Sequence, residues 1–306
     1  MTDESTIIDV QGLVKRFGHK TVVNGVSLKV KRGEIYGFLG PNGSGKTTTI
    51  RMLCGLLRPD GGSGVCLGWD IIRESTQIKF QVGYMAQRFS LYEDLTVKEN
   101  LDFIANLYGI RSRREAVDRA IERIRLERFS NQLAGTLSGG WKQRLALACC
   151  MIHQPKLLLL DEPTAGVDPK ARREFWEEVH KLAGEGITSM ISTHYMDEAE
   201  RCHRLAYIAY GNLLTSGTAE QVVAGENLTT WLANGGNIHA LQERLQGLPA
   251  WDQIVPFGNT LHVSGKDAET LEKSITPFMA AGYRWTRTTT SLEEVFISLM
   301  SRAGGD

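Results

Sequence analysis

The sequence lacks any apolar run long enough to cross a membrane as a helix. Its longest strongly apolar stretch is residues 145–152, far short of the roughly 20 residues that a bilayer-spanning helix needs. The first residues, Met1 to Ser5, are acidic, and no apolar segment follows them, so they do not resemble a secretory signal. We therefore expect a chain that is soluble by itself and stays in the cytoplasm.

An excess of either charge is also absent. The 306 residues include 35 basic and 35 acidic side chains, for a formal net charge of zero. General nucleic-acid binders carry a basic excess, so no nucleic-acid partner is expected. The arginine-rich segment 111–128 carries interleaved acids, as on a solvated helix face with ion pairs.

Cysteine is scarce and shows no pairing pattern. There are five cysteines, with no C-x-x-C pair among them, which gives no indication of a disulfide framework or a zinc motif. Cys149 and Cys150 are adjacent in an expected helix, so their side chains should diverge. We expect the cysteines to be reduced, buried and apolar in character, as in a reducing compartment.

The most specific motif present lies at residues 40–47. It consists of Gly40, Pro41, Asn42, Gly43, Ser44, Gly45, Lys46 and Thr47. This is the pattern G-x-x-x-x-G-K-[ST] of a nucleotide phosphate-binding loop. The flanking residues fit, since 34–39 predict a strand and 48–53 predict a helix that ends near Gly55. Glycines let backbone N–H groups face phosphate oxygens, and the positive end of the helix adds to the attraction. Lys46 is expected to reach the β- and γ-phosphates, and the Thr47 hydroxyl to bind Mg²⁺.

A second motif follows four leucines at residues 157–160, which favour a buried parallel strand, although periodicity alone fits a helix as well. Asp161 and Glu162 come directly after this run. A carboxylate at the end of a parallel strand lies where α/β sheets bind ligands. Asp161 is expected to hold Mg²⁺ directly or through water, and Glu162 to face an attacking water. An acidic loop after a core strand is the simpler alternative.

Between these motifs lies Leu137-Ser138-Gly139-Gly140. With this segment the chain resembles the ATP-binding subunits of ABC transporters, whose signature L-S-G-G-Q opens a helix shortly before the second strand motif. The other family elements also appear in order along the chain, and the resemblance covers about residues 5–220. They are the adenine-stacking aromatic at Phe17, the Q-loop glutamine at Gln87, the D-loop ending in Asp168 and the switch histidine at His194. Taken alone, Phe17 also suits a core position.

The resemblance implies a full set of site residues. The expected ATP-binding residues are Phe17, Gly40, Pro41, Asn42, Gly43, Ser44, Gly45, Lys46, Thr47, Thr48, Gln87, Ser138, Gly139, Gly140, Asp168 and His194. The expected catalytic residues are Lys46, Glu162 and His194, and the expected Mg²⁺ ligands are Thr47, Gln87 and Asp161.

The signature segment also implies a second subunit. Ser138, Gly139 and Gly140 open a helix, so their N–H groups can cup a γ-phosphate, although serine caps helices without any ligand as well. In the family, that phosphate belongs to ATP held by the other subunit. The resemblance therefore implies a head-to-tail dimer, of identical or different chains, with two ATP molecules at its interface.

Trp141 departs from the family pattern, in which a glutamine approaches the ribose across the interface. Tryptophan supplies a large apolar face and one N–H donor, but no carbonyl acceptor. Two interpretations stay open: a contact to the partner's nucleotide, or a packing residue on the signature helix.

The predicted fold class is α/β, a P-loop NTPase of ABC type with a mostly parallel sheet, an antiparallel β subdomain in 7–30 and a helical subdomain in 93–150. The expected domains are residues 1–222 and a small α+β unit at 223–306. In the latter, a hairpin about Gly258-Asn259, a helix over 267–281 and flanking elements give the order β-α-β-β-α-β, which is ferredoxin-like with a terminal helix. Its ending, residues 291–296, is also seen in ATPases of ABC-2-type exporters.

The resemblance thus implies an ATP-hydrolysing motor subunit of an export-type transporter, peripheral on the cytoplasmic face of the inner membrane and paired with a separate membrane-spanning permease. One alternative is a soluble ABC ATPase of translation or DNA repair. Repair members insert a long coiled coil before the signature, and translation members carry two ATPase units, and neither feature is evident here. A second alternative is a non-hydrolysing, ATP-gated subunit, against which Glu162 and His194 argue.

Overall fold

The computed structural model describes residues 5–246, 251–279 and 282–303. Most of the acidic N-terminal segment, residues 1–4, lies outside them. The chain divides into two compact units, Met1–Leu213 and Leu214–Asp306, and each is described by itself. The boundary predicted after residue 222 falls inside helix α8 (Ala219–Glu226). Among the described residues, no helix has the combination of length and hydrophobicity that crossing a bilayer requires.

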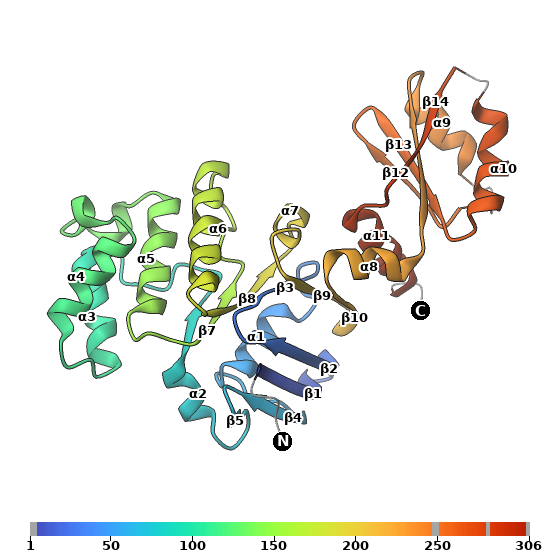
Figure 1. Cartoon of the computed structure of the whole chain (residues 1–306). Helices are drawn as coiled ribbons and strands as arrows, with labels where there is room; N and C mark the ends of the chain where they lie inside the picture. Colours follow the sequence, from blue (N-terminus) through green and yellow to red (C-terminus); the bar gives the residue numbers. More distant parts are fainter. Residues whose placement is uncertain (1–4, 247–250, 280–281, 304–306) are drawn as a thin grey trace. The chain divides into compact units, whose positions relative to one another are not determined.

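A six-stranded sheet in the order β10-β9-β3-β8-β7-β6 forms the centre of the first unit (Figure 1). Its strands are β3 (Ile35–Leu39), β6 (Val82–Met85), β7 (Leu157–Asp161), β8 (Thr188–Thr193), β9 (Arg204–Ala209) and β10 (Asn212–Gly217). β3 is parallel to β8 and β9, and β7 is parallel to β6 and β8. Every residue of β3, β7 and β8 is buried, as expected for strands covered on both faces. The predicted parallel sheet is confirmed.

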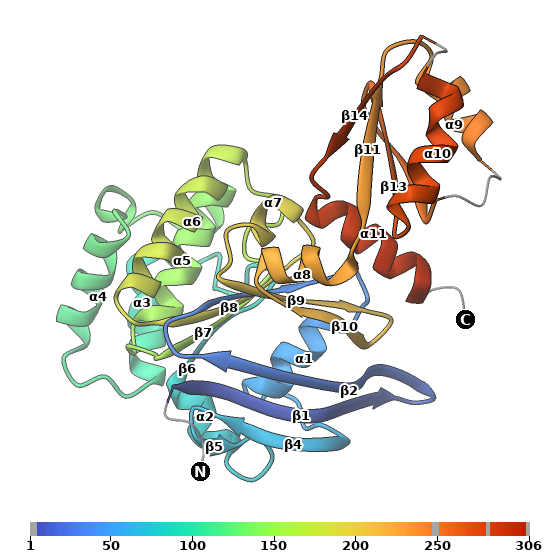
Figure 2. The same ribbon diagram turned by 45° about the vertical axis from the view of Figure 1, so that its right-hand side comes forward.

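An antiparallel sheet in the order β2-β1-β4-β5 packs on the same core. Its strands are β1 (Thr6–Phe17), β2 (Lys20–Lys31), β4 (Gly61–Cys66) and β5 (Trp69–Asp70). Helix α1 (Lys46–Leu53) contacts β1 and β2 of this sheet and β7 of the central one (Figure 2). Buried side chains such as Ile8, Phe38 and Ile50 join these elements in one cluster. This core fixes α1 between the two sheets.

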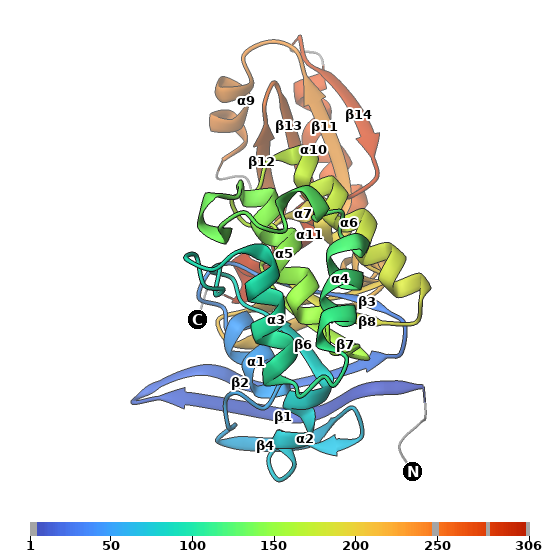
Figure 3. The same cartoon turned by 90° about the vertical axis from the view of Figure 1, so that its left-hand side faces the viewer.

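The helical subdomain has its own hydrophobic core. It contains α3 (Val97–Leu107), α4 (Arg113–Arg123) and α5 (Gly139–Met151), which lie side by side (Figures 1 and 3). Leu101, Val117 and Leu145 bring one buried side chain from each helix to this core. The remaining helices of the first unit are α2 (Ser75–Gln81), α6 (Pro169–Gly184) and α7 (Met196–Ala199). The predicted helical insertion is confirmed.

The second unit is an α+β fold. It comprises α8, β11 (Thr229–Asn234), α9 (Ile238–Leu245), β12 (Gln253–Phe257), β13 (Thr260–Gly265), α10 (Ala268–Met279), β14 (Arg284–Thr288) and α11 (Leu292–Ala303). The sheet order is β12-β13-β11-β14 with antiparallel pairs throughout, and α9 and α10 lie on the same side of it (Figures 1 and 2). The β-α-β-β-α-β order and the Gly258-Asn259 hairpin match the prediction. The predicted end of the second helix, 280–281, lies outside the described residues.

All five cysteines are free. Four are buried and Cys202 is partly exposed. Burial raises the pKa of the Cys54 thiol to about 11 and that of Cys150 to about 12, so these thiols are protonated and unreactive at neutral pH. This agrees with the expected role as small apolar residues.

The first unit, extended to Gly217 so that β10 is complete, should fold without the remainder of the chain, because all six strands of the central sheet and the hydrophobic clusters lie before residue 218. A chain that ends at Gly217 should be soluble and should unfold in a single cooperative transition when followed by circular dichroism. A broad, non-cooperative melt of that chain would show that the second unit is required to complete the first.

Candidate nucleotide site

The loop at residues 40–45 packs closely against the backbone of Val22 and Ile208. A Cβ atom at Gly40 would lie 2.0 Å from the carbonyl oxygen of Ile208, and one at Gly45 would lie 2.6 Å from that of Val22. Gly45 also has a φ of 106°, in the left-handed region. Only glycine satisfies both constraints. The loop can therefore bring its backbone N–H groups close to a ligand.

Helix α1 starts directly at Lys46 rather than at the predicted residue 48. Gly45 is its N-cap and supplies no side-chain hydrogen bond. The first N–H groups of a helix have no partner within the helix. Those of Lys46, Thr47 and Thr48 thus face the loop with the positive end of the helix dipole behind them, an arrangement suited to an anion.

Lys46 is a buried cation with three close oxygen partners. Its Nζ donates to the carbonyl oxygens of Gly40 (2.7 Å) and Pro41 (3.1 Å) and lies 3.2 Å from Oε1 of Glu162. The side chain is only 4% exposed. Burial lowers its pKa, and the nearby Glu162 carboxylate opposes that shift. A phosphate oxygen at this point would meet a desolvated ammonium group, which strengthens their attraction.

Asp161 and Thr47 form an oxygen cluster beside the loop. The Thr47 hydroxyl donates to Asp161 Oδ1 (3.1 Å), and the Ser192 hydroxyl donates to the same atom (2.7 Å). Asp161 is fully buried, and its Oδ2 has no hydrogen-bond partner among the described residues. Mg²⁺ prefers one or two carboxylates together with hydroxyl and phosphate oxygens. The donor set and the unpartnered oxygen therefore fit Mg²⁺ held between protein and phosphate.

Glu162 is the point on which three predicted residues converge. Its Oε2 accepts a hydrogen bond from Gln87 Nε2 (3.0 Å) and lies 3.3 Å from His194 Nδ1. Oε1 faces Lys46, and the residue is 7% exposed. Its φ of 47° is in the left-handed region, which is rare for a side chain of this kind. Such backbone strain is typical of functional sites.

One residue of this arrangement was missed by the sequence analysis. The Ser192 hydroxyl accepts from the backbone N–H of Glu162 (2.9 Å) while donating to Asp161. It thereby fixes both acids from the neighbouring strand. The available signal was its place two residues before His194.

The remaining predicted residues lie outside the pocket at the loop, whose lining is Val22, Asn42, Gly43, Gly45, Lys46, Thr47, Thr48, Gln87 and Glu162. Phe17 is 52% exposed at the end of β1, so the structure excludes the alternative of a core position. Asp168 caps α6 through the N–H groups of Lys170 and Ala171.

The signature residues begin α5. Ser138 is its N-cap and makes no side-chain capping bond, and Ser138 and Gly139 are exposed. A Cβ at Gly140 would lie 2.6 Å from that of Ala171, so close packing against α6 accounts for that glycine. The exposed N–H groups at this helix start suit a ligand that approaches from outside the chain.

Trp141 packs within the helical subdomain. Its ring centroid lies 4.6 Å from that of Phe129, and the guanidinium groups of Arg128 and Arg144 lie 5.4 Å and 5.0 Å from its ring. It is half-buried against the helical core. The packing interpretation thus has direct structural support.

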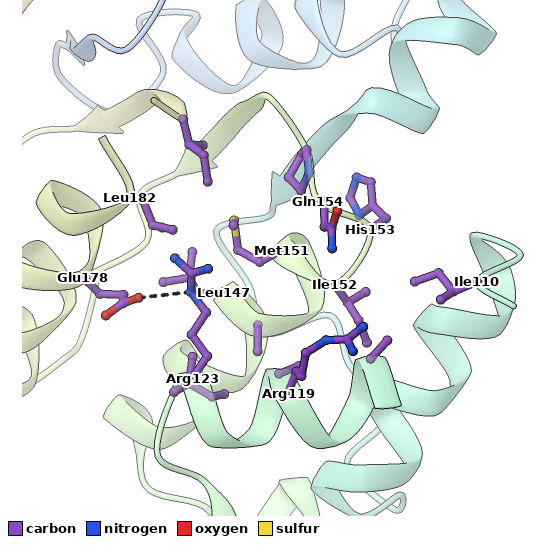
Figure 4. Close-up of a pocket in the computed structure, with 16 residues that line it drawn as sticks. Ile110, Arg119, Arg123, Leu147, Met151, Ile152, His153, Gln154, Glu178 and Leu182 are labelled. Carbon is purple, nitrogen blue, oxygen red and sulfur yellow. Dashed lines mark ion pairs between the residues drawn. The ribbon is translucent and has the colours of Figure 1, made fainter. Parts of the chain in front are cut away.

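A separate pocket lies among α4, the end of α5 and α6 (Figure 4). Apolar side chains such as Leu147, Ile152 and Leu182 line it, and Arg123 pairs with Glu178 at 3.6 Å across it. None of the predicted site residues is part of its lining. This pocket is therefore separate from the candidate nucleotide site.

The fold and the site define a P-loop nucleotide-binding protein, and comparisons with known proteins agree. Residues 23–165 match the family described as ABC transporter. The chain is 38% identical over 299 residues to the Nod factor export ATP-binding protein I of Burkholderia orbicola, covering 96% of this chain and 97% of that protein. The corresponding protein of Ralstonia nicotianae is 35% identical over 304 residues, covering 97% and 94%. The chain belongs to the family of ABC transporter ATP-binding proteins.

Another relative is longer. The probable multidrug ABC transporter ATP-binding protein YbhF of Escherichia coli is 46% identical over 225 residues, or 73% of this chain. The matched region spans only 39% of that relative's length.

Solved structures give the same family. The structure of cbiO1 of Clostridium perfringens, part of an ABC transporter complex, superposes with a TM-score of 0.66 at 28% identity, covering 73% of this chain and 92% of that one. An ATP-binding cassette solved as a dimer in a post-hydrolysis state with ADP and Pi gives a TM-score of 0.64 at 27% identity, covering 69% and 98%.

The packing of Trp141 generates a prediction. Trp141→Gln should lower the melting temperature measured without nucleotide, by an amount equivalent to about 1–3 kcal/mol, because a half-buried ring is lost from its contacts with Phe129 and the two arginines. Trp231→Gln, which removes a half-buried tryptophan from the second unit, serves as the matched control for ATP affinity. An unchanged melt together with altered ATP affinity would assign Trp141 to nucleotide contact instead.

Proposed function

We propose that the chain is the ATP-hydrolysing motor subunit of an export-type ABC transporter. The observation that carries the proposal is the convergence of Lys46, Gln87 and His194 on Glu162, beside the phosphate loop. The names of the relatives, which refer to multidrug transport and Nod factor export, support the export class. By this proposal the chain lies on the cytoplasmic face of the inner membrane, attached to a separate permease.

In this mechanism the phosphates of ATP lie against the N–H groups of the loop and of the first turn of α1, with Lys46 at the β- and γ-phosphates. Thr47, Asp161 and Gln87 would hold Mg²⁺, which supplies neutralisation of phosphate charge. Glu162 accepts a proton from a water molecule while the oxygen of that water attacks the γ-phosphorus. The attack is in line with the bond between the γ-phosphorus and the oxygen that bridges it to the β-phosphate. That bond breaks, and ADP and phosphate leave.

Gln87 and His194 would orient this step through the same carboxylate oxygen of Glu162. Both nitrogens already lie within 3.3 Å of Oε2, close enough to hold the carboxylate or a water beside it. Each follows a strand of the central sheet, β6 and β8 respectively, so the rigid sheet sets their separation. This positioning would favour the transition state over the bound substrate.

The exposed start of α5 favours a second ATP-binding subunit. Its N–H groups at Ser138 and Gly139 would bind the γ-phosphate of ATP held by the partner, and Asp168 and Phe17 would complete the site from the interface and the adenine side. Closure around ATP and opening after hydrolysis would then drive the permease. The dimeric post-hydrolysis form of a related cassette supports this arrangement.

The permease would dock on an apolar surface next to Gln87. A pocket lined by residues of the segment 84–91 and of α3 and α5 lies there. Leu107 in its lining is 64% exposed, and Phe80, Tyr92 and Phe103, which are close in sequence to lining residues or in ring contact with them, are 42% to 59% exposed. Exposed apolar residues that gather about one pocket favour an interaction surface. Gln87 lies within the docking segment and contacts Glu162, which would link the partner to hydrolysis.

The helix lengths argue against the alternative of a soluble DNA-repair ATPase. Between Lys46 and Ser138 the longest helices, α3 and α4, have 11 residues each. Such helices are far too short for the long coiled coil of the repair proteins.

Glu162→Gln should abolish most turnover while ATP binding persists, because the amide keeps the shape but accepts no proton. We expect kcat to fall by a factor of about 10²–10⁴, measured as phosphate release. Glu177→Gln, an exposed substitution on α6, is the matched control and should be silent. Lys46→Ala should instead weaken ATP binding in a calorimetric titration. Turnover by Glu162→Gln close to that of the wild type would contradict the assigned role.

Leu107→Asp should prevent co-purification of the chain with its permease, because it places a charge in the apolar docking surface. The ATPase rate of the isolated chain should be unaffected, since Leu107 is 64% exposed. Leu56→Asp, at an exposed leucine outside the pocket lining, is the control and should leave co-purification intact. Equal retention of the permease by Leu107→Asp and the wild type would place the docking surface elsewhere.

A further inference from the structure

Glu198 is a fully buried acid that the nucleotide chemistry described above does not use. It lies on the short helix α7 and is 0% exposed. Its Oε1 accepts a hydrogen bond from the Thr164 hydroxyl at 2.5 Å, and its Oε2 accepts one from the Thr193 hydroxyl at 2.6 Å. Both oxygens of one carboxylate are thus occupied by hydroxyl groups from separate segments of the chain.

The two threonines belong to the segments that carry the proposed chemistry. Thr164 is two residues after Glu162, and Thr193 immediately precedes His194. The Thr193 hydroxyl also accepts from the backbone N–H of Tyr195 at 3.0 Å. Glu198 therefore connects two turns. One follows Glu162 at the end of β7, and the other contains His194 and follows β8.

A cation is present, but it is farther away than the hydroxyl groups. Arg172 Nε lies 3.7 Å from Oε1 of Glu198, and its guanidinium group lies 4.2 Å from the ring of Tyr195. That ring is in turn 4.2 Å from the ring of His194. A buried carboxylate is costly unless it is hydrogen-bonded and paired. Here the two short bonds and the arginine meet that requirement, and the two bonds join the segments that follow β7 and β8.

We propose that Glu198 is a positioning residue for ATP hydrolysis, acting as a carboxylate clamp that fixes the distance between Glu162 and His194. The inference rests on the proposed hydrolytic function. Glutamine is an imperfect replacement, because its single acceptor oxygen can take only one of the two hydroxyl protons. At the other threonine the NH₂ group could only donate to the hydroxyl oxygen, so the hydroxyl proton would lose its acceptor and the tie to that turn would weaken.

The clamp predicts a specific kinetic signature. Glu198→Gln should lower kcat by about tenfold to 100-fold while KM stays within about threefold, since small misplacements of catalytic groups cost rates of that order. Thr164→Val and Thr193→Val, each of which deletes one bond, should give smaller losses in kcat. Glu200→Gln, an exposed acid two residues further on, is the control and should match the wild type.

The clamp also predicts non-additivity. Adding Glu198→Gln to Glu162→Gln should cost no further rate, because both changes act on the same group. A full additional loss in the double variant, or a kcat of Glu198→Gln within about twofold of the wild type, would overturn the inference.

A second measurement is independent of turnover. In hydrogen–deuterium exchange of the nucleotide-free chain, Glu198→Gln should deprotect residues 162–168 and 192–196 together and leave β1 and α3 as in the wild type. Loss of protection throughout the first unit would indicate a general structural role, and no change in either segment would also overturn the clamp. A wild-type chain that binds ATP without hydrolysing it would refute the proposed function, while the exchange result would still decide whether the clamp exists.

Discussion

The site depends on one buried cation and the oxygens that hold it. Lys46 is 4% exposed and lies 3.2 Å from Glu162. An ammonium group so far from water is stable only when nearby oxygens replace the solvent, and here the loop carbonyls and the carboxylate do so. The same contacts prepare the cation for phosphate, because a desolvated charge interacts strongly with whatever approaches it. Loop, strand and helix must all keep their places for this arrangement to exist.

The topology of the sheet supplies those places. Strands β3, β8, β7 and β6 are adjacent and parallel, so their carboxyl ends meet at one edge. The residues that follow them are the phosphate loop, His194, Glu162 and Gln87. Segments far apart in the chain thus converge where α/β sheets bind ligands. Behind this edge, the Ser192 hydroxyl bonds to Asp161, and the Glu198 carboxylate bonds to Thr193 next to His194. These contacts fix the positions of the acids and the histidine.

The parts of this arrangement that rest on local motifs could be predicted from the sequence, and the parts that rest on non-local contacts could not. The phosphate loop and the acids after the leucine run were predictable because their chemistry resides in consecutive residues. Glu198 was not, because a buried acid on a short helix has no periodic pattern and its partners, Thr164 and Thr193, are found only in the folded chain. The start of α1 was placed two residues late, since Gly45 caps the helix by backbone geometry rather than with a capping side chain. The position of Trp141 was undecided for a similar reason: its neighbours Phe129 and Arg144 are brought together by tertiary packing.

The central claim is that a phosphate oxygen of bound ATP replaces Glu162 as the partner of the Lys46 ammonium group. The most direct test is the structure of the chain with Mg²⁺ and a non-hydrolysable ATP analogue. The account predicts Lys46 Nζ within hydrogen-bond distance of a β- or γ-phosphate oxygen, Asp161 on the Mg²⁺ side, and Glu162 released from its ion pair to face the γ-phosphorus. An analogue bound away from the loop, or one bound at the loop with the pair between Lys46 and Glu162 intact, would contradict it.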